Sequence, residues 1–259
     1  MKTNKLRTFS EISPKPKCEG GMKTRPFFRY LLVVSIVLVL VGATPSISPS
    51  TNVFKTGESI RFGAYSNGIK VGSGSLVYRG QEVLGTEQAQ HVEFQVSSFT
   101  VNDNESVYGS VDFSSPILVN RNVRLFGRDE VINENYAADR KSVKISKYVN
   151  NASAVTQDIA SRVELNNVLL FIYKLRNDPE LKVGKSYRIA LPTQAFELIV
   201  RAQRNLRVPL GVFKTFYIES DPPKYKIWLK TDKDRAPIRI QGFIGAGLVY
   251  LSAIEISNP

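Results

Sequence analysis

GESIRFGAYSNGIKVGSGSLVY, residues 57–78, carries the clearest structural pattern in the chain. Apolar side chains occupy every second position from Ile60 to Ala64, which is typical of a strand with one buried face. Asn67 and Gly68 follow, and both residues accept the positive φ angles of a type I′ turn. The sequence therefore predicts a β-hairpin, with strands over 59–65 and 70–79.

Strand-like runs continue along most of the chain. They cover 89–101, 105–113, 117–126, 141–149, 186–191, 195–203, 211–219, 226–230, 237–243 and 248–256. With the hairpin they make about a dozen strands, which is typical of an antiparallel sheet, curved or closed into a barrel. The segment between residues 125 and 140 shows no clear pattern and is expected to be a loop.

One segment breaks the strand pattern. Between Asp158 and Arg176 apolar residues recur at spacings of three to five, which predicts an amphipathic helix of about five turns. Asp158 is the expected N-cap, and Asn177, Asp178 and Pro179 end the helix. The predicted fold class is therefore mainly β (α+β), with this one amphipathic helix packed on a curved or barrel-like antiparallel sheet.

The N-terminal part has the order of a secretory signal peptide. Basic residues up to Arg29 precede residues 30–41, which are almost all apolar, and small residues follow. Cleavage is expected between Ala43 and Thr44. The alternative is a retained membrane anchor, although the apolar stretch 30–43 has 14 residues and a spanning helix needs about 20. Under either interpretation the rest of the chain lies outside the cytoplasm.

These features divide the chain into four segments. Everything needed for export begins at Met22, so we interpret residues 1–21 as a mis-assigned N-terminal extension. Residues 22–43 are the signal peptide or anchor, and residues 44–56, rich in Ser, Thr and Pro, are a linker. Residues 57–256 are the exported β-rich domain.

Charge and composition exclude several classes of protein. The chain carries 35 Lys and Arg against 23 Asp and Glu, a net charge of +12, and half of that excess lies in residues 1–43. The remainder is dispersed, whereas a nucleic-acid-binding protein clusters its charge on one face, so no nucleic-acid partner is expected. One Cys and one His exclude a disulfide and argue against a Cys/His zinc site, and we expect no metal and no cofactor.

A catalytic site would have to use the single histidine, His91. His91 and Glu93 point to the same face of a predicted strand and could form a general acid–base pair. The simpler interpretation, which we favour, is a polar residue on a solvated face. No nucleophile–base pair or metal cluster can be assembled from the sequence, so it predicts a protein that is not an enzyme.

One aromatic residue suggests a ligand site. Trp228 shares its strand face with Lys226 and Lys230. A Trp flanked by lysines could line the floor of an apolar groove that also receives an acidic head group. The alternative is an amphipathic Trp that shields the sheet beside the lysine stems.

Three stretches together resemble a bacterial exported family known as domain of unknown function 3108. The first is residues 57–78, similar to the family's opening of Gly-Glu and two strands. The second is VLLFIYKLRNDPELKVGKSY, residues 168–187, where the family also has a helix ending in Leu-Arg. The third is VPLGVFKTFYIE with IWLKTDKDRAPIRI, residues 208–219 and 227–240, which match Pro-Leu-Gly-x-Phe, Trp-Leu, an acidic turn and a Pro-flanked strand.

The resemblance implies an exported, mainly β domain of a diderm bacterium, most simply a periplasmic one. The alternative location is the inner membrane, with the domain anchored in the periplasm by an uncleaved N-terminal segment, which would then be its only membrane contact. The family carries no accepted activity, so the resemblance transfers no functional residues. Two hypotheses remain for the function: a non-catalytic binding module for a lipid or other apolar envelope molecule, or a structural protein that binds another envelope protein.

Overall fold

The computed structural model describes residues 52–150, 152–242 and 249–259. The predicted extension 1–21, the signal or anchor segment 22–43 with its cleavage site at Ala43 and Thr44, and most of the linker lie outside the described residues. The described end of the linker packs on the sheet, because Phe54 is only 4% exposed.

The described residues form one antiparallel sheet of 14 strands and a single helix, α1 (Val168–Asn177). From edge to edge the order is β8 to β1 and then β14 to β9, so consecutive strands pair with each other except β8 and β9, and β1 pairs in addition with β14. The strands are β1 (Ser59–Ser66), β2 (Ile69–Leu84), β3 (Glu87–Ser98), β4 (Val101–Gly109), β5 (Pro116–Leu125), β6 (Arg128–Tyr136), β7 (Ser142–Val149), β8 (Val155–Ala160), β9 (Ser186–Leu191), β10 (Gln194–Val208), β11 (Gly211–Asp221), β12 (Lys226–Lys230), β13 (Pro237–Gln241) and β14 (Val249–Ser257).

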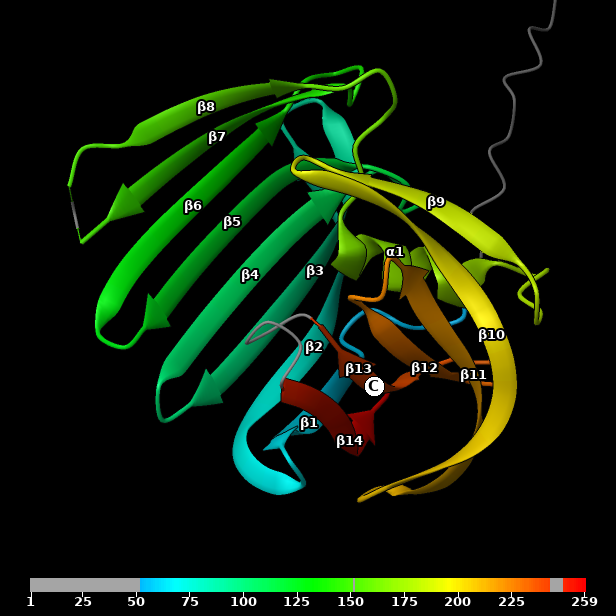
Figure 1. Cartoon of the computed structure of the whole chain (residues 1–259). Coiled ribbons are helices and arrows are strands. Elements are labelled where there is room, and N and C mark those ends of the chain that lie inside the picture. The colour runs from blue at the N-terminus through cyan, green and yellow to red at the C-terminus, as the bar shows by residue number, and fades with distance from the viewer. Residues whose placement is uncertain (1–51, 151, 243–248) are drawn as a thin grey trace, which may run out of the picture. The chain divides into compact units, whose positions relative to one another are not determined.

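The sheet curves around the helix without closing. Figure 1 shows β3 to β8 on one side of α1 and β9 to β11 on the other, with β1 and β14 between the two sets. The edge strands β8 and β9 do not pair with each other. The predicted mainly β fold, a curved antiparallel sheet with one helix, is confirmed.

The central hairpin forms as the sequence predicts. Asn67 and Gly68 have φ angles of 49° and 81°, as the type I′ turn requires. Gly72 on β2 lies where the backbones approach closely, because a Cβ atom there would be 2.2 Å from the carbonyl oxygen of Ser97. β1 also pairs with β14, so this hairpin lies in the middle of the sheet.

The predicted start of the helix is wrong. Asp158 is not an N-cap but a residue of β8, where it pairs with Lys144 of β7. Helix α1 begins at Val168, and its N-cap is Asn167, whose Oδ1 accepts hydrogen bonds from the backbone amides of Leu169 (2.8 Å) and Leu170 (3.3 Å). The segment before the N-cap is not helical, and its apolar residue Val163 matches the helical spacing only by coincidence.

Two strands lie in segments for which the sequence predicted none. β6 occupies the expected loop, and β8 ends within the first turn of the expected helix. In β6 polar residues outnumber apolar ones on both faces, and β8 is short with polar residues at 156–158, so neither strand shows a clear alternation in the sequence. Their pairing partners, and not their own pattern, make them strands.

The helix fills the concave side of the sheet. Eight of its ten residues are buried. It approaches β4 so closely that a Cβ atom on Gly109 would lie 2.3 Å from Leu170 Cδ1. On another side Tyr173 joins a cluster of aromatic rings, whose centroids are 4.8–6.0 Å apart, formed with Phe54, Tyr78 and Phe113.

A buried ion pair fixes the C-terminal end of the helix. Arg176 donates from Nη1 and Nη2 to the two carboxylate oxygens of Glu58, at 2.5 and 2.8 Å, and both residues are at most 1% exposed. Arg176 also donates to the backbone carbonyl of Asp234, in the turn between β12 and β13 (3.1 Å from Nε and from Nη2). Its guanidinium lies 4.6 Å from the ring centroid of Phe54.

Removing one charge of this pair is expected to be costly. Glu58→Gln leaves the Arg176 charge buried without its carboxylate, which lowers the free energy of unfolding by about 3–5 kcal/mol. Glu255→Gln is the matched control, because Glu255 pairs with Arg61 on the surface, where the two side chains are 52% and 60% exposed; its loss costs less than about 1 kcal/mol. Urea unfolding of both variants measures the difference, and equal losses would contradict a special role for the buried pair.

Candidate functional site

Charged residues face the concave side where the helix begins. The register places Phe94 of β3, Glu105 of β4 and Arg121 of β5 side by side. They share their face with the core residues Val96 and Val107, which are buried under the helix side of the sheet. The inner face therefore changes from apolar to charged as it passes the N-terminal end of α1.

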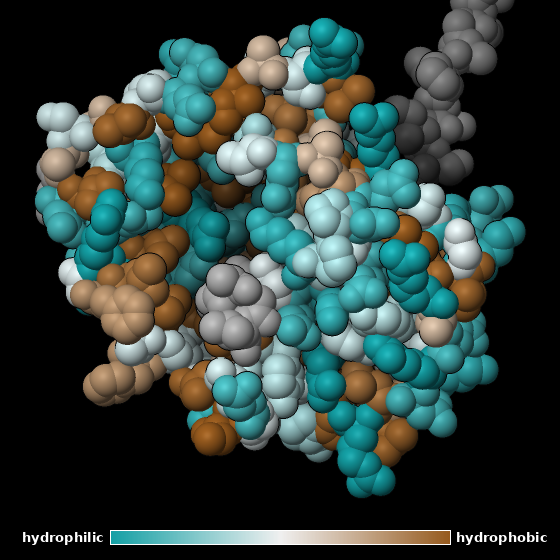
Figure 2. Space-filling view, in the orientation of Figure 1, coloured by the Kyte–Doolittle hydropathy of each residue, from teal (hydrophilic) through white to brown (hydrophobic). Residues whose placement is uncertain are grey.

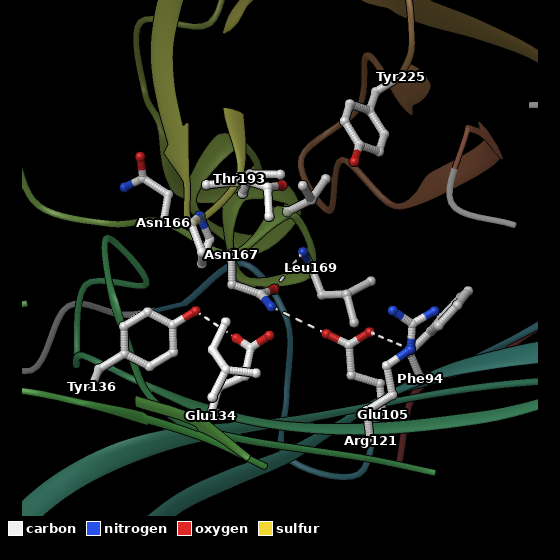
Figure 3. Close-up of a pocket in the computed structure, with 14 residues that line it drawn as sticks. Phe94, Glu105, Arg121, Glu134, Tyr136, Asn166, Asn167, Leu169, Thr193 and Tyr225 are labelled. Carbon is white, nitrogen blue, oxygen red and sulfur yellow. Dashed lines mark hydrogen bonds and ion pairs between the residues drawn. The ribbon is translucent and has the colours of Figure 1, made fainter. Parts of the chain in front are cut away.

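These residues line a polar pocket of about 240 Å³ between the sheet and the helix. Figure 3 shows Glu105, Glu134 and Arg121 on the sheet side, facing Asn167 and Leu169 at the start of α1. The complete lining is Phe94, Glu105, Arg121, Glu134, Tyr136, Ile145, Asn166, Asn167, Val168, Leu169, Leu191, Pro192, Thr193 and Tyr225.

Glu105 connects the pocket floor to the helix cap. Its Oε1 accepts a hydrogen bond from Nδ2 of Asn167 at 3.1 Å, while the other amide atom of Asn167 caps α1. Burial raises the pKa of the Glu105 carboxyl above its ordinary value of 4.5, although Arg121 and Asn167 both act to lower it. The cap residue thus fixes both the helix start and one pocket carboxylate.

A second carboxylate lies on the neighbouring strand. Tyr136 donates its hydroxyl to Oε2 of Glu134 at 2.6 Å. Burial raises the pKa of Glu134. The hydrogen bond from Tyr136 and the charge of Arg121 act to lower it, but burial has the larger effect. Burial, reinforced by the Glu134 charge, also raises the pKa of Tyr136. The phenol stays protonated and remains a hydrogen-bond donor.

The single cation of the pocket is already paired. Arg121 donates to Asp103 through Nε at 2.8 Å and Nη2 at 2.5 Å, and its Nε lies 3.8 Å from Oε2 of Glu105. These hydrogen bonds raise the pKa of Arg121. The pocket therefore offers carboxylates, a phenol and side-chain amides that can bind a polar group by hydrogen bonds. Its lining contains no His, Cys, Lys or Ser.

An apolar pocket lies farther along the same concave face, at the hairpin ends. It has a volume of about 550 Å³. Its lining is Ala64, Ser66, Val71, Val96, Ser98, Phe99, Thr100, Val101, Leu125, Phe126 and Val249. No charged side chain contributes to it. Among the described residues, no cluster of three or more His, Cys, Asp or Glu is arranged to hold a metal ion, and no helix is long and apolar enough to cross a bilayer.

The two pockets follow one another on the same strands. On β3, Phe94 lines the polar pocket and Val96 the apolar one. Residues two apart on one strand face are separated by about 7 Å. On β4, Glu105 and Val101 belong to the two pockets, with Asp103 between them. The concave face is thus polar at the helix and apolar at the hairpin ends.

The predicted Trp228 site lies on the other face of the sheet. Ile227 and Leu229 point into the core, whereas Trp228 packs against Tyr217 at a centroid distance of 5.0 Å and is 6% exposed. Arg204 and Arg239 lie 5.6 and 5.8 Å from its ring. The indole N–H is buried with no hydrogen-bond partner among the described residues.

The two lysines beside Trp228 have carboxylate partners. Lys226 lies 3.4 Å from Glu219, and Lys230 lies 2.7 Å from Asp232 and 2.9 Å from Asp234. The three predicted residues therefore do not line either concave pocket, and a ligand-binding role for them stays a prediction.

His91 lies on the outer face of β3, the face that carries the exposed Gln95, but neighbouring side chains cover its ring. It is 7% exposed, with Nδ1 2.6 Å from Oε1 of Glu82 and Nε2 2.8 Å from Oγ of Ser106. Its ring stacks on Tyr108 at 4.2 Å, and Glu93 lies 3.7 Å from Nε2. Both ring nitrogens of His91 therefore lie within hydrogen-bond distance of protein groups, Nδ1 of the Glu82 carboxylate and Nε2 of the Ser106 hydroxyl.

The raised carboxyl pKa values make a testable prediction about stability. The folded protein holds the Glu134 proton more tightly than the unfolded chain does, so this group favours folding most at low pH, and that contribution is lost as the pH rises through the raised pKa. Glu134→Gln keeps an acceptor for Tyr136 and does not ionise. The variant is therefore expected to gain stability relative to the natural protein between about pH 5 and about pH 8.

Urea unfolding of both proteins across that range is the measurement. Asp129→Asn is the control, because Asp129 on the outer face has a pKa that its partner Arg124 lowers, so its effect has the opposite sign. A stability difference for Glu134→Gln that does not change with pH would contradict a raised pKa.

Comparison with solved structures finds matches at low sequence identity and with TM-scores below 0.5. A β-barrel-like protein of the DUF1849 family from Brucella abortus is 9% identical, with a TM-score of 0.47 over 80% of this chain and 99% of its own. An exported protein with a YmcC-like fold from Bacteroides fragilis is 10% identical, with a TM-score of 0.26 over 79% and 97%. A lipoprotein from Parabacteroides distasonis is 10% identical, with a TM-score of 0.25 over 79% and 98%.

The search of curated proteins finds no match. Among family models, the one described as "Protein of unknown function (DUF3108)" matches residues 59–252. That match extends from β1 to β14 and contains the helix and both concave pockets. The chain therefore belongs to the DUF3108 family.

Proposed function

We propose that this protein is a non-catalytic binding module for an apolar or amphipathic molecule of the cell envelope, held on the concave face of the sheet. The observation that carries the proposal is the apolar pocket of about 550 Å³ at the hairpin ends. Pockets for small molecules commonly have volumes of about 300–1,000 Å³ and mostly apolar walls. Protein interiors are otherwise closely packed, as they are here where the helix packs on the sheet.

The order of the two pockets favours an amphipathic ligand. An apolar chain in the outer pocket would contact Val96, Val101 and Leu125. Its polar end would reach the carboxylates and amides beside the start of α1. On β4 this is the step from Val101 in the apolar pocket to Glu105 in the polar pocket. The intervening Asp103–Arg121 pair is satisfied internally and needs no ligand group.

The cellular location is part of the same proposal. The pattern of residues 22–43 supports export, and we propose that the domain works in the periplasm, either free or held at the inner membrane by an uncleaved segment. Trp228, Lys226 and Lys230 remain a second candidate site, on the outer face, for an acidic group.

One observation favours the alternative, an envelope protein that assembles with another protein. β8 is an edge strand of six residues, five of them exposed, and it carries no Lys or Pro that would discourage pairing. A partner strand could extend the sheet there. This alternative does not require either concave pocket to be occupied.

A charge in the apolar pocket is expected to abolish ligand binding without unfolding the protein. Leu125 lines the pocket but is 44% exposed, so Leu125→Glu is tolerated by the fold. The control is Val131→Glu, because Val131 is 38% exposed on the outer face of the neighbouring strand. Titration with the uncharged apolar dye 1-N-phenylnaphthylamine should show binding at least about tenfold weaker for Leu125→Glu and unchanged for Val131→Glu.

Native mass spectrometry of the exported protein, purified without detergent and then extracted with organic solvent, tests for a natural ligand. Extra mass that is released as lipid would support the binding module. A bare chain mass together with no dye binding would overturn it and would leave the assembly protein as the better explanation.

A further inference from the structure

The exposed apolar residues of this protein are concentrated at one edge. The exposed Phe, Leu and Ile residues of the described chain lie at three hairpin ends, β1–β2, β3–β4 and β5–β6, and the exposed Tyr148 and Val155 lie at the end of β7–β8. We call this set the apolar edge: Ile69, Val71, Phe99, Leu125, Phe126, Tyr148 and Val155.

The meander brings these residues together although they are far apart in sequence. Alternate turns of an antiparallel meander lie at the same end of the sheet, so the turns β1–β2, β3–β4, β5–β6 and β7–β8 form one row. Figure 1 shows the row along the lower left of the sheet, and Figure 2 shows brown and tan atoms gathered along the same edge. The pocket of about 550 Å³ opens beside it.

Phe126 occupies an exposed turn position whose backbone conformation favours Asn or Gly over Phe. It is 78% exposed and has a φ of 48°, followed by Gly127 with a φ of 81°. The turn at Asn67 and Gly68 has φ angles of 49° and 81° and uses the residues that this geometry favours. A bulky residue in the left-handed region is unfavourable, and here it also exposes an aromatic ring to water.

Phe99 lies on the neighbouring turn and is fully exposed, at 102% of its reference area. The two turns are joined, because the backbone amide of Phe126 donates to the carbonyl of Thr100 at 3.0 Å. The β3–β4 turn is also braced by Ser98, whose Oγ accepts from the amide of Val101 at 3.1 Å. The two rings therefore protrude from a rigid pair of turns.

Basic residues flank the apolar edge. Arg124 and Arg128 are 63% and 57% exposed beside the β5–β6 turn, and Lys70 is exposed next to the β1–β2 turn. Asp129 pairs with Arg124, while Lys70 has no carboxylate partner among the described residues. Arg128 is paired as well, with Glu130 at 3.0 Å, so Lys70 supplies the one positive charge of this flank that no carboxylate among the described residues balances, and that charge suits the phosphates of an anionic lipid surface.

We propose that the apolar edge inserts into the surface of a lipid bilayer. Separate rings on protruding turns suit the disordered interior of a membrane, whereas a protein partner would need a shaped groove. Phe99 and Phe126 line the apolar pocket as well, so apolar surface is continuous from the edge into the concave face. This inference goes beyond ligand binding, because it says where the protein acts, and insertion does not require the pocket to hold a ligand.

A local probe tests insertion, since residues 30–43 of the full chain could bind lipid by themselves. In a Cys18→Ser background, Phe126→Cys carries a nitrobenzoxadiazole label, and Val212→Cys carries the same label as the control. Val212 is 57% exposed on the β10–β11 hairpin, away from the apolar edge. Vesicles of phosphatidylethanolamine and phosphatidylglycerol in equal amounts should raise and blue-shift the emission at position 126 and leave position 212 unchanged. No response at position 126, or equal responses at both, would overturn the proposal.

A second variant removes the ring without harming the fold. With the label on Val155→Cys, Phe126→Asn should raise the lipid concentration at half-maximal signal by about tenfold, because one buried aromatic ring is lost from the bilayer. Its urea midpoint should be unchanged or higher, because Asn suits this turn. A lowered midpoint would show that Phe126 serves folding, and an unchanged lipid titration would show that it does not insert; either result contradicts the proposal.

Discussion

The structure depends on the buried ion pair between Arg176 and Glu58. It joins the C-terminal end of the helix to the segment before β1 and, through the Asp234 carbonyl, to the turn between β12 and β13. These three segments are the landmarks by which the sequence resembles its family: Gly-Glu, Leu-Arg and the acidic turn. Because separating the helix from the segment before β1 would leave a charge buried alone, and separating it from the β12–β13 turn would remove hydrogen bonds from the buried guanidinium, the helix is held inside the curved sheet. These three family landmarks therefore stabilise the fold, and none of them lies in either concave pocket.

The places available for function are those that the helix does not fill. Its C-terminal half completes the core, whereas its N-cap, Asn167, faces Glu105 across the polar pocket. Past this point the concave face of β3 to β7 has no covering element among the described residues. Polar groups near the helix and apolar groups near the hairpin ends then divide the uncovered face. One short helix therefore determines both the stable core and the shape of the open groove.

Sequence analysis predicted the fold better than the candidate site, for physical reasons. The central hairpin was predictable because its alternation and its Asn-Gly turn are local signals. The pocket carboxylate Glu105 was not, because Asn104 and Ser106 make the other face of β4 equally polar. Its contact with Asn167 spans 62 residues, and only the assembled sheet reveals it. The predicted helix start was wrong because Val163 continues the helical spacing, although it precedes the N-cap and is exposed.

The pairing of β1 with β14 has a consequence for how the protein forms. β1 to β8 and β9 to β14 are two meanders of consecutive hairpins. Each meander can form from contacts between residues that are close in sequence. The ladder that unites them joins residues almost 200 positions apart, such as Ser59 and Ser257. The groove between the two halves therefore exists only after the last strand has docked. During export, the exposed edge of β1 would be an unpaired template, and loss of the last strand would leave two separate ribbons joined through the helix.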